Sequence, residues 1–213
     1  MKRSFWLIPV ILLALYGCSS PPVEVNRFDP VAGGPFISTL DKNGEIYASY
    51  IDPEIQLVTT LYEYNSIIVM PLTIVNRTDH DIGPADYSLS LCDGRDFKPV
   101  RMLDRNDLVN VKGKLEGKGT DFGSGIEGMA LAATVNAFED LTNQPSTKMM
   151  VKGINQAIND YFEFRPVYAS EARTGLLCFL VDFKLEYPLT VRLKVKDKLI
   201  DIRFLPRPKK EGN

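Results

Sequence analysis

Apolar and polar residues alternate with a period of two over much of the chain between residues 46 and 205. The clearest alternation is carried by Leu189, Val191, Leu193, Val195, Ile200, Ile202 and Phe204. The polar residues 196–198 separate the two halves of this set and predict a hairpin. Such alternation is typical of antiparallel sheets, which place one face on a core and the other in water.

Strand signals begin near Ile46 and recur in segments that turn residues separate. We expect strands over residues 55–61, 68–74, 87–92, 97–103 and 174–183. Asp93 and Gly94 suit a turn, and Pro71 argues for an edge position or a bulge because it has no N–H to donate. About seven strands of this kind favour an immunoglobulin-like antiparallel β-sandwich over residues 36–205.

The period changes to a helical one within a segment of about 104–164. The apolar residues with helical spacing are Ile126, Met129, Ala130, Ala133, Ala137, Leu141, Val151, Ile154, Ile158, Tyr161 and Phe162. Pro145 and Ser146 suit a helix start between the two groups. We therefore predict an inserted α-helical hairpin, preceded by a mobile glycine-rich loop over residues 112–128.

The first seventeen residues have the layout of a secretory signal peptide. Lys2 and Arg3 precede an apolar run over residues 5–16, and Cys18 follows. This run is shorter than the roughly 20 residues that a helix needs to cross a bilayer, and no later segment reaches that length without charges.

The segment Leu15-Tyr16-Gly17-Cys18 resembles the lipobox of bacterial lipoproteins, although Tyr16 stands where a small residue is usual. The resemblance implies lipidation of Cys18 and cleavage before it. The alternative is an ordinary secretory signal that contains a cysteine. Several acyl chains hold a protein durably to a membrane. In many such lipoproteins an aspartate after the cysteine causes retention in the inner membrane. Ser19 stands at that position here, so the resemblance implies the outer membrane, with the protein facing the periplasm.

Composition outside the signal peptide describes one globular domain with two polar ends. Residues 18–35 are rich in Pro and Gly and predict a lipidated N-terminus and an extended tether with a reach of about 50 Å. Residues 206–213 predict a basic disordered tail. Cleavage leaves 23 basic and 27 acidic residues, a formal charge of −4, which argues against nucleic acid as a partner.

Cys92 and Cys178 are an even pair in an oxidising compartment. Each lies on the face of its strand opposite the stronger apolar stripe. A surface cross-strand disulfide and two unpaired, partly covered thiols both fit this pattern. A catalytic thiol fits it poorly, because the only histidine, His80, is distant from both in sequence.

The remaining candidates for chemistry are weak. Asp79, His80, Asp81 and Asp86 offer metal ligands without the spacing of a known calcium loop, and solvated turn residues explain them better. No nucleophile elbow accompanies His80, and the glycine-rich residues 123–125 lack the lysine of a phosphate loop. We therefore expect no enzyme activity, no metal site and no cofactor.

The order of features along the chain is similar to that of a loosely defined group of bacterial envelope lipoproteins: a tether, strands, a Gly/Ala-rich helical insert, and Gly175 ahead of an apolar strand. This resemblance implies a non-enzymatic interaction or structural role with an envelope protein as partner. The predicted contact residues are Ile126, Met129, Ala133, Ile154 and Tyr161. The alternative for this hairpin is complete packing on its own sheet. The alternative function is binding of a small ligand or glycan by Tyr47, Tyr50, Tyr62, Tyr64 and Tyr168.

Overall fold

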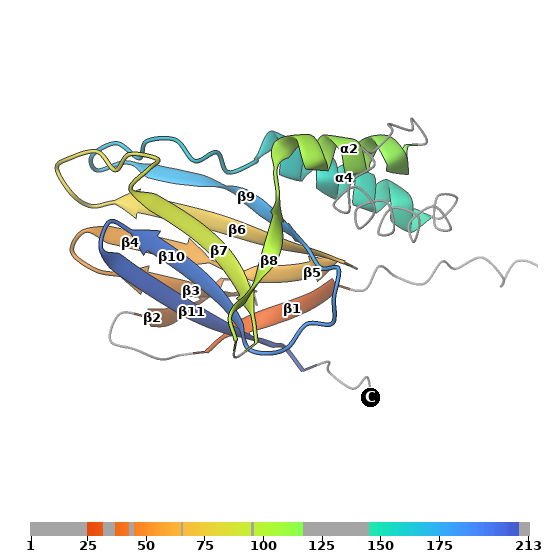
Figure 1. Cartoon of the computed structure of the whole chain (residues 1–213), viewed down its shortest axis with the longest axis horizontal. Coiled ribbons are helices and arrows are strands. Elements are labelled where there is room, and N and C mark those ends of the chain that lie inside the picture. The colour runs from red at the N-terminus through yellow and green to blue at the C-terminus, as the bar shows by residue number, and fades with distance from the viewer. Residues whose placement is uncertain are drawn as a thin grey trace, which may run out of the picture.

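The computed structural model describes residues 25–31, 37–42, 45–64, 66–94, 96–116 and 145–208 (Figure 1). The strands in these residues are β1 (Val25–Pro30), β2 (Ile37–Lys42), β3 (Glu45–Ile51), β4 (Ile55–Thr59), β5 (Leu61–Tyr64), β6 (Ile67–Asn76), β7 (Tyr87–Asp93), β8 (Lys98–Leu103), β9 (Ala172–Leu180), β10 (Leu189–Val195) and β11 (Lys198–Pro206). The helices are α2 (Arg105–Leu115) and α4 (Pro145–Asn159).

Eight of these strands close into an antiparallel β-barrel. Around the ring the order is β1, β5, β6, β9, β8, β7, β10 and β11, and β11 returns to β1 with Phe28 opposite Pro206. The expected immunoglobulin-like sandwich is therefore wrong. Alternation shows that one face of each strand is buried, but a second sheet and the far wall of the same sheet bury that face equally well.

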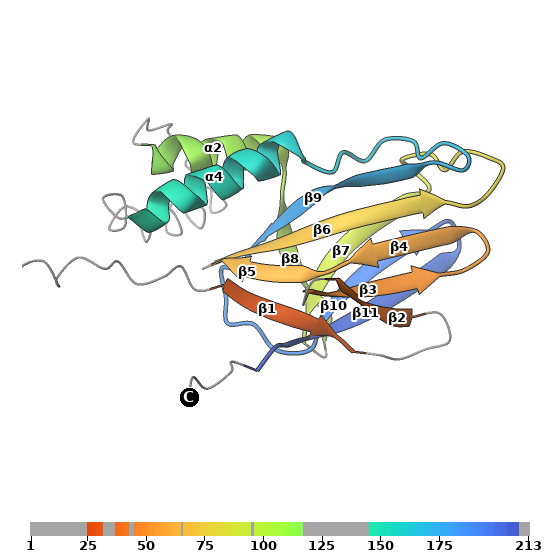
Figure 2. The same cartoon turned by 180° about the vertical axis from the view of Figure 1, so that it is seen from behind.

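Strands β4, β3 and β2 form a limb that leaves the barrel at β6 (Figure 2). One half of β6 pairs with β5 and the other half pairs with β4, in the same register, with Tyr62 opposite Val69 and Thr59 opposite Leu72. Thr60 alone separates β4 from β5. The two are thus one strand with an interruption. Its second edge pairs with β1 along β5 and with β3 along β4, and β2 pairs with the far edge of β3.

Pro71 accounts for that interruption. Strand β6 is paired on both edges and the register contains no extra residue, so the expected edge position and the expected bulge are both wrong. Leu176 lies opposite Pro71 on β9. Its N–H donates to Asp160 and its carbonyl accepts from Phe162, so neither group is directed at β6. Pro71 accordingly directs its nitrogen towards Thr60, where it has no N–H to donate.

Strand β1 lies inside the segment predicted to be a tether. Residues 25–30 pair with β5 on one edge and with β11 on the other, and Phe28 is only 1% exposed. The tether prediction for residues 18–35 is therefore wrong for residues 25–30, because one buried aromatic and two neighbouring strands outweigh a polar, proline-rich composition. At the other end, Pro206 belongs to β11, so the predicted tail begins too early.

The helical insert is present but differs from the predicted hairpin. Helix α4 confirms the predicted second helix as far as Asn159, whereas Tyr161 and Phe162, which the helical spacing included, lie beyond its end. Helix α2 starts at Arg105, directly after β8, where no helix was expected, and it reaches into the loop predicted from residue 112. The predicted first helix, over residues 126–141, lies outside the described residues. Asp104 begins α2 well, since its Oδ1 accepts from the N–H of Asp107 at 2.7 Å.

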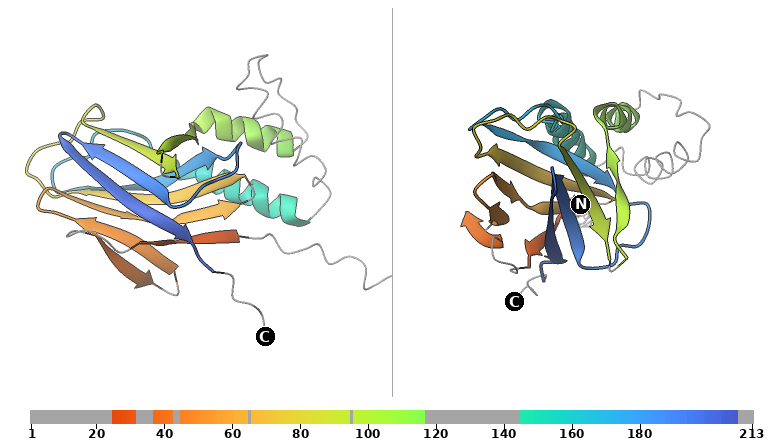
Figure 3. Two further views of the ribbon diagram at one scale, coloured as in Figure 1. Left: turned by 60° about the horizontal axis from the view of Figure 1, so that its bottom comes forward. Right: turned by 60° about the vertical axis from the view of Figure 1, so that its left-hand side comes forward.

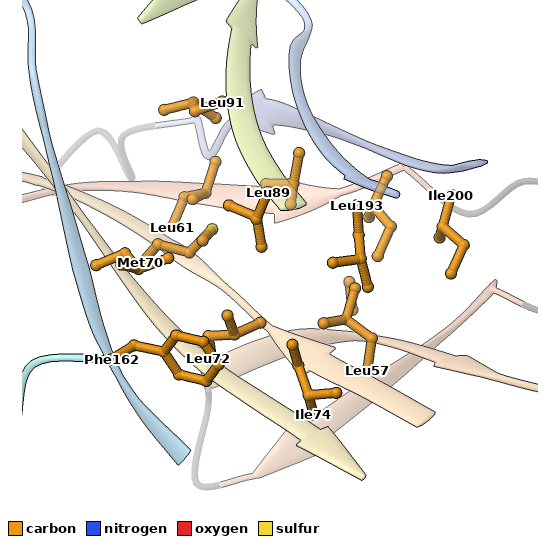
Figure 4. Packing of buried hydrophobic residues seen from close by; sticks show 14 of the residues in the cluster. Leu57, Leu61, Met70, Leu72, Ile74, Leu89, Leu91, Phe162, Leu193 and Ile200 are labelled. Atoms are coloured by element: carbon orange, nitrogen blue, oxygen red, sulfur yellow. The ribbon is translucent and has the colours of Figure 1, made fainter. Parts of the chain in front are cut away.

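The barrel strands and the limb share one core of large apolar side chains, as Figure 4 shows with Leu57 of β4 among the labelled residues. The aromatic members with almost no exposure are Phe28, Phe162, Phe179 and Phe204. A second apolar cluster lies outside the barrel, where α2 and α4 cover β9 (Figure 3). From Leu177 to its end at Leu180, β9 is therefore buried on both faces, which confirms the expected buried strand for these residues but not for the whole of residues 174–183.

Candidate functional site

The chain leaves α4 and crosses the edge of β9 at very short range. The N–H of Leu176 donates to the carbonyl of Asp160 at 2.7 Å, and the N–H of Phe162 donates to the carbonyl of Leu176 at 2.9 Å. Gly175 permits this approach. A Cβ built there would lie 2.7 Å from Cα of Phe162 and 2.9 Å from the carbonyl oxygen of Asp160.

Beyond this crossing the chain closes a gap in the barrel wall. Strand β8 lies between β7 and β9 but pairs only with the C-terminal end of each. The N-terminal parts of β7 and β9 therefore have no strand between them. Phe162 enters the interior and meets Phe164 edge to face, with ring centroids 5.4 Å apart. The hydroxyl of Tyr87 donates to the carbonyl of Arg165 at 2.7 Å. Aromatic packing and this hydrogen bond hold the closing segment in place.

A groove of about 400 Å³ lies on the outer surface where α4 ends beside β6 and β9. It is lined by Pro71, Gln156, Asn159, Asp160, Tyr161, Thr174, Gly175 and Leu176. The lining combines apolar residues with residues that carry amide, carboxylate and hydroxyl groups. This combination suits a small polar ligand with an apolar face, because apolar contact supplies affinity and a few polar groups fix orientation.

Tyr161 is half-buried at one side of this groove. Its hydroxyl donates to the carbonyl of Leu103 at 3.4 Å. Burial, together with the carboxylates of Asp104 and Asp107, raises the pKa of Tyr161. The side chain is therefore a neutral phenol whose one O–H donates to Leu103, so that it offers a ligand an acceptor oxygen and an aromatic edge but is unsuited to act as a base.

The two cysteines expected as a possible disulfide are free and buried. Cys92 lies opposite Pro99 and Cys178 lies opposite Leu103, on the two different edges of β8. Four residues along a strand span roughly 13 Å, so the structure does not bring the sulfurs together. Burial raises the pKa of Cys178 to about 12, which makes this thiol a poor nucleophile. Cys18 lies outside the described residues.

The residues predicted to contact a partner divide into two groups. Ile126, Met129 and Ala133 lie outside the described residues. Ile154 is only 7% exposed and packs, with Tyr161 beside it, in the cluster between the helices and the barrel. Ile154 and Tyr161 therefore contact their own chain, which agrees with the alternative that the helical insert packs on its own sheet.

His80 lies in an exposed turn before β7. Its Nδ1 is 3.1 Å from Oδ1 of Asp79, and its Nε2 is 2.6 Å from Nζ of Lys196. Asp81 accepts from the N–H of Ala169, and Asp86 accepts from the N–H of Gly83. Within the described ranges no three His, Cys, Asp or Glu side chains gather as a metal site would require. The four residues thus shape turns in this structure.

A cluster around Asp52 was missed by sequence reasoning. Asp52 is 6% exposed and its carboxylate accepts from the N–H groups of Glu54 and Ile55, from the hydroxyl of Tyr50 and from Nζ of Lys198. Burial alone would raise the pKa of Asp52, but these hydrogen bonds outweigh it and hold the pKa below its ordinary value. The cluster fastens the limb to the β10–β11 hairpin, so its role is structural.

Comparison with known proteins identifies no matching family model, no matching curated protein and no matching solved structure. The described helices contain no segment that is long and apolar enough to cross a membrane. Function must therefore be argued from the sequence signals and from the geometry.

Proposed function

We propose that this chain is a lipoprotein of the bacterial cell envelope, anchored through acyl chains on Cys18. The observation that carries the proposal is the sequence Leu15-Tyr16-Gly17-Cys18 directly after a basic start and an apolar run. The position of the cysteines supports it. Cys92 and Cys178 are buried in the barrel wall, whereas Cys18 precedes the first described strand by seven residues.

We further propose a non-enzymatic, interaction or structural role at the periplasmic face of the outer membrane. The described residues that most resemble catalytic groups are engaged elsewhere or are poorly suited to chemistry. His80 contacts Asp79 and Lys196 in an exposed turn, and the pKa of Cys178 is raised to about 12. The proposed contact with an envelope protein rests on Ile126, Met129 and Ala133, since Ile154 is already buried.

Fractionation of cells that express Cys18→Ser tests the anchor. The matched control is Ser19→Ala, which leaves the thiol in place. We expect the control to be in the membrane fraction and to incorporate an alkyne-labelled fatty acid, and the Cys18→Ser chain to incorporate none. Equal labelling of the two chains would refute the proposal.

A second candidate function, binding of a small ligand or glycan, is favoured by the groove beside α4. Its lining residues include a carboxylate, two amides and a tyrosine, which are groups that recognise sugar hydroxyls and sugar ring faces. Titration with a soluble peptidoglycan disaccharide, followed by amide chemical shifts, tests this function. Shifts at Tyr161 and Thr174 that disappear in Asp160→Asn support it. Shifts absent at saturating disaccharide, or confined to the opposite end of the barrel, would exclude it.

A further inference from the structure

The outer face of β4, β6 and β9 contains a block of six residues without a charge. The block consists of two cross-strand rows: Gln56, Val75 and Ala172, and then Val58, Thr73 and Thr174. Each of the six side chains is half-buried or exposed, whereas Leu57 and Ile74, which lie between them on β4 and β6, belong to the core. We call these six residues the uncovered face.

Helix α4 covers the other half of β9. Its Ile154 packs in one cluster with Cys178 of β9, and the helix ends at Asn159. The groove at this end of α4 includes Pro71 and Leu176, the pair next to the uncovered face. Figure 2 shows that α4 ends part of the way along β6 and β9. Among the described residues, no helix continues this layer over the uncovered face.

The dimensions of the uncovered face match one helix. Three strands about 4.8 Å apart present a width of roughly 10 to 14 Å, and an α-helix with its side chains is about 10 Å across. From Pro71 to Val75 the face extends for roughly 13 Å, which equals about nine residues of a helix. The hydroxyls of Thr73 and Thr174 lie 3.0 Å apart and hydrogen-bond to each other, so part of their polar capacity is used within the face.

The opposite face of the molecule has a different chemistry. The outward residues of β10 and β11 include Arg192, Lys194, Asp201 and Arg203. Covering such a face with an apolar partner is costly, because a charge that leaves water needs a partner. No residue of the uncovered face carries that cost. Of the two faces, the uncovered face is therefore the one suited to aliphatic contact.

The end of α4 gives an incoming helix a preferred direction. Helix α4 has no basic residue in its last turn, and the exposed Asp160 follows it. The last carbonyls of a helix lack intrahelical partners and form the negative end of its dipole. Of the next basic residues along the chain, Arg165 contacts Glu163, and Arg173 donates to the carbonyl of Pro166. The N-terminal end of a second helix, with free N–H groups and a positive partial charge, is therefore favoured beside Asp160.

We infer that the uncovered face binds one amphipathic α-helix of an envelope protein, which lies in line with α4 and places its N-terminal end beside Asp160. The aliphatic side of this helix covers Val58, Thr73 and Val75, as α4 covers the other half of β9. The inference rests on the proposed interaction role, to which it gives a described surface and a partner chemistry. A contact of about nine helical residues is short, and confinement of the anchored chain near its partner raises the effective concentration.

Photocrosslinking in cells tests the site and distinguishes a helix from other occupants. Benzoylphenylalanine is placed singly at Thr73, at Val75 and, as the matched control, at Ser88, an exposed outward residue of β7. Urea unfolding checks that each variant folds, and Gln56 and Val58 on β4 provide a second pair with the same spacing. Two residues along a strand span about 6.6 Å, which equals about four residues of a helix but two of an extended chain.

We expect Thr73 and Val75 to crosslink to one envelope protein at residues about four apart, with the Thr73 contact nearer its N-terminus. The Ser88 position should give no such product. Thr73→Lys should lower the yield from Val75 roughly tenfold, because it places an unpaired charge in the contact, whereas Ser88→Lys should leave that yield unchanged.

Contacts two residues apart, crosslinks within the same chain or a glycan product would overturn the inference. Products from Ser88 alone would also overturn it, but would leave the interaction role in place. The absence of products at every position would count against both the site and the interaction role.

Discussion

The backbone of Phe162 passes so close to Gly175 that no side chain fits between them. A Cβ at Gly175 would lie 2.7 Å from Cα and 2.8 Å from N of Phe162. This contact allows the chain that follows α4 to enter the barrel and to place Phe162 in the core. It also forms one side of the polar groove beside α4. Gly175 thus serves both the closure of the barrel and the shape of the candidate site.

Gly175→Ala should destabilise the protein by roughly 1 to 3 kcal/mol, because backbone atoms cannot yield as a flexible side chain would. Gly153→Ala is the matched control. Among the described residues, no atom outside the helix's own backbone lies within 4 Å of a Cβ at Gly153, and replacing a helical glycine with alanine stabilises a helix by about 0.5 to 1 kcal/mol. Urea unfolding of the two variants should give changes of opposite sign. An unchanged free energy of unfolding in Gly175→Ala would show that the contact between Phe162 and Gly175 is looser than described.

Phe179→Ala should lower the free energy of unfolding by roughly 3 to 5 kcal/mol, as expected when a fully buried aromatic ring is removed. Phe179 has 0% exposure on the barrel side of β9. Tyr168→Ala, at a residue that is 51% exposed, should change the free energy by less than about 0.5 kcal/mol. Similar losses in the two variants, measured by urea unfolding, would contradict the assigned core.

Asp52→Asn should destabilise the protein by roughly 1.5 to 3 kcal/mol at neutral pH, since it removes the charge that four hydrogen bonds stabilise. The folded-state pKa of Asp52 lies below its ordinary value. Its contribution is therefore complete above the pKa of the unfolded chain and is lost as the pH falls through the folded pKa. The difference in stability between parent and variant should shrink between about pH 5 and about pH 2. A difference that stays constant over this range would exclude the carboxylate as its source.

Cys92 and Cys178 should resist thiol reagents in the folded protein. Both side chains are buried, and the raised pKa of Cys178 leaves almost no thiolate at mildly alkaline pH. In the unlipidated chain from Cys18 onwards, iodoacetamide should modify Cys18 rapidly and the other two only after unfolding in urea. Mass spectrometry of the intact chain distinguishes these cases. A disulfide between Cys92 and Cys178, seen as the failure of both to react in urea, would contradict the structure.

The strands with the most regular alternation were predicted well. The β10–β11 hairpin at residues 196–198 and the turn at Asp93 and Gly94 are present, with Gly94 at a φ of 62°. Such features depend only on residues that are close in sequence: a glycine tolerates positive φ, and a period of two marks a strand. They can be predicted from the sequence because neighbouring residues alone determine them.

The closure of the sheet and the candidate site were not predictable in the same way. Closure requires β1 to pair with β11, which is about 180 residues away in sequence, and one buried aromatic side chain, Phe28, is the sequence signal for that strand. The groove joins side chains from β6, β9 and the end of α4, which share no motif. Gly175 was noticed in the sequence, but the crossing of Phe162 that requires a glycine there is visible only in three dimensions.

Ser19→Asp should move the protein from the outer to the inner membrane of a Gram-negative host, since aspartate after the lipidated cysteine retains many lipoproteins there. The substitution precedes the described barrel and should leave its stability unchanged. Ser20→Asp is the matched control, with the same charge one residue further on. Density-gradient separation of the two membranes checks the result. An unchanged distribution for Ser19→Asp would contradict the proposed outer-membrane sorting.

The mass of the N-terminal peptide of the protein purified from membranes tests the anchor most directly. The proposal predicts a peptide that begins at Cys18 and carries a thioether-linked diacylglyceryl group on Sγ, with residues 1–17 absent. This peptide should shift from the aqueous to the detergent phase on phase separation. An unmodified peptide, or one that begins at any residue other than Cys18, would contradict the central claim.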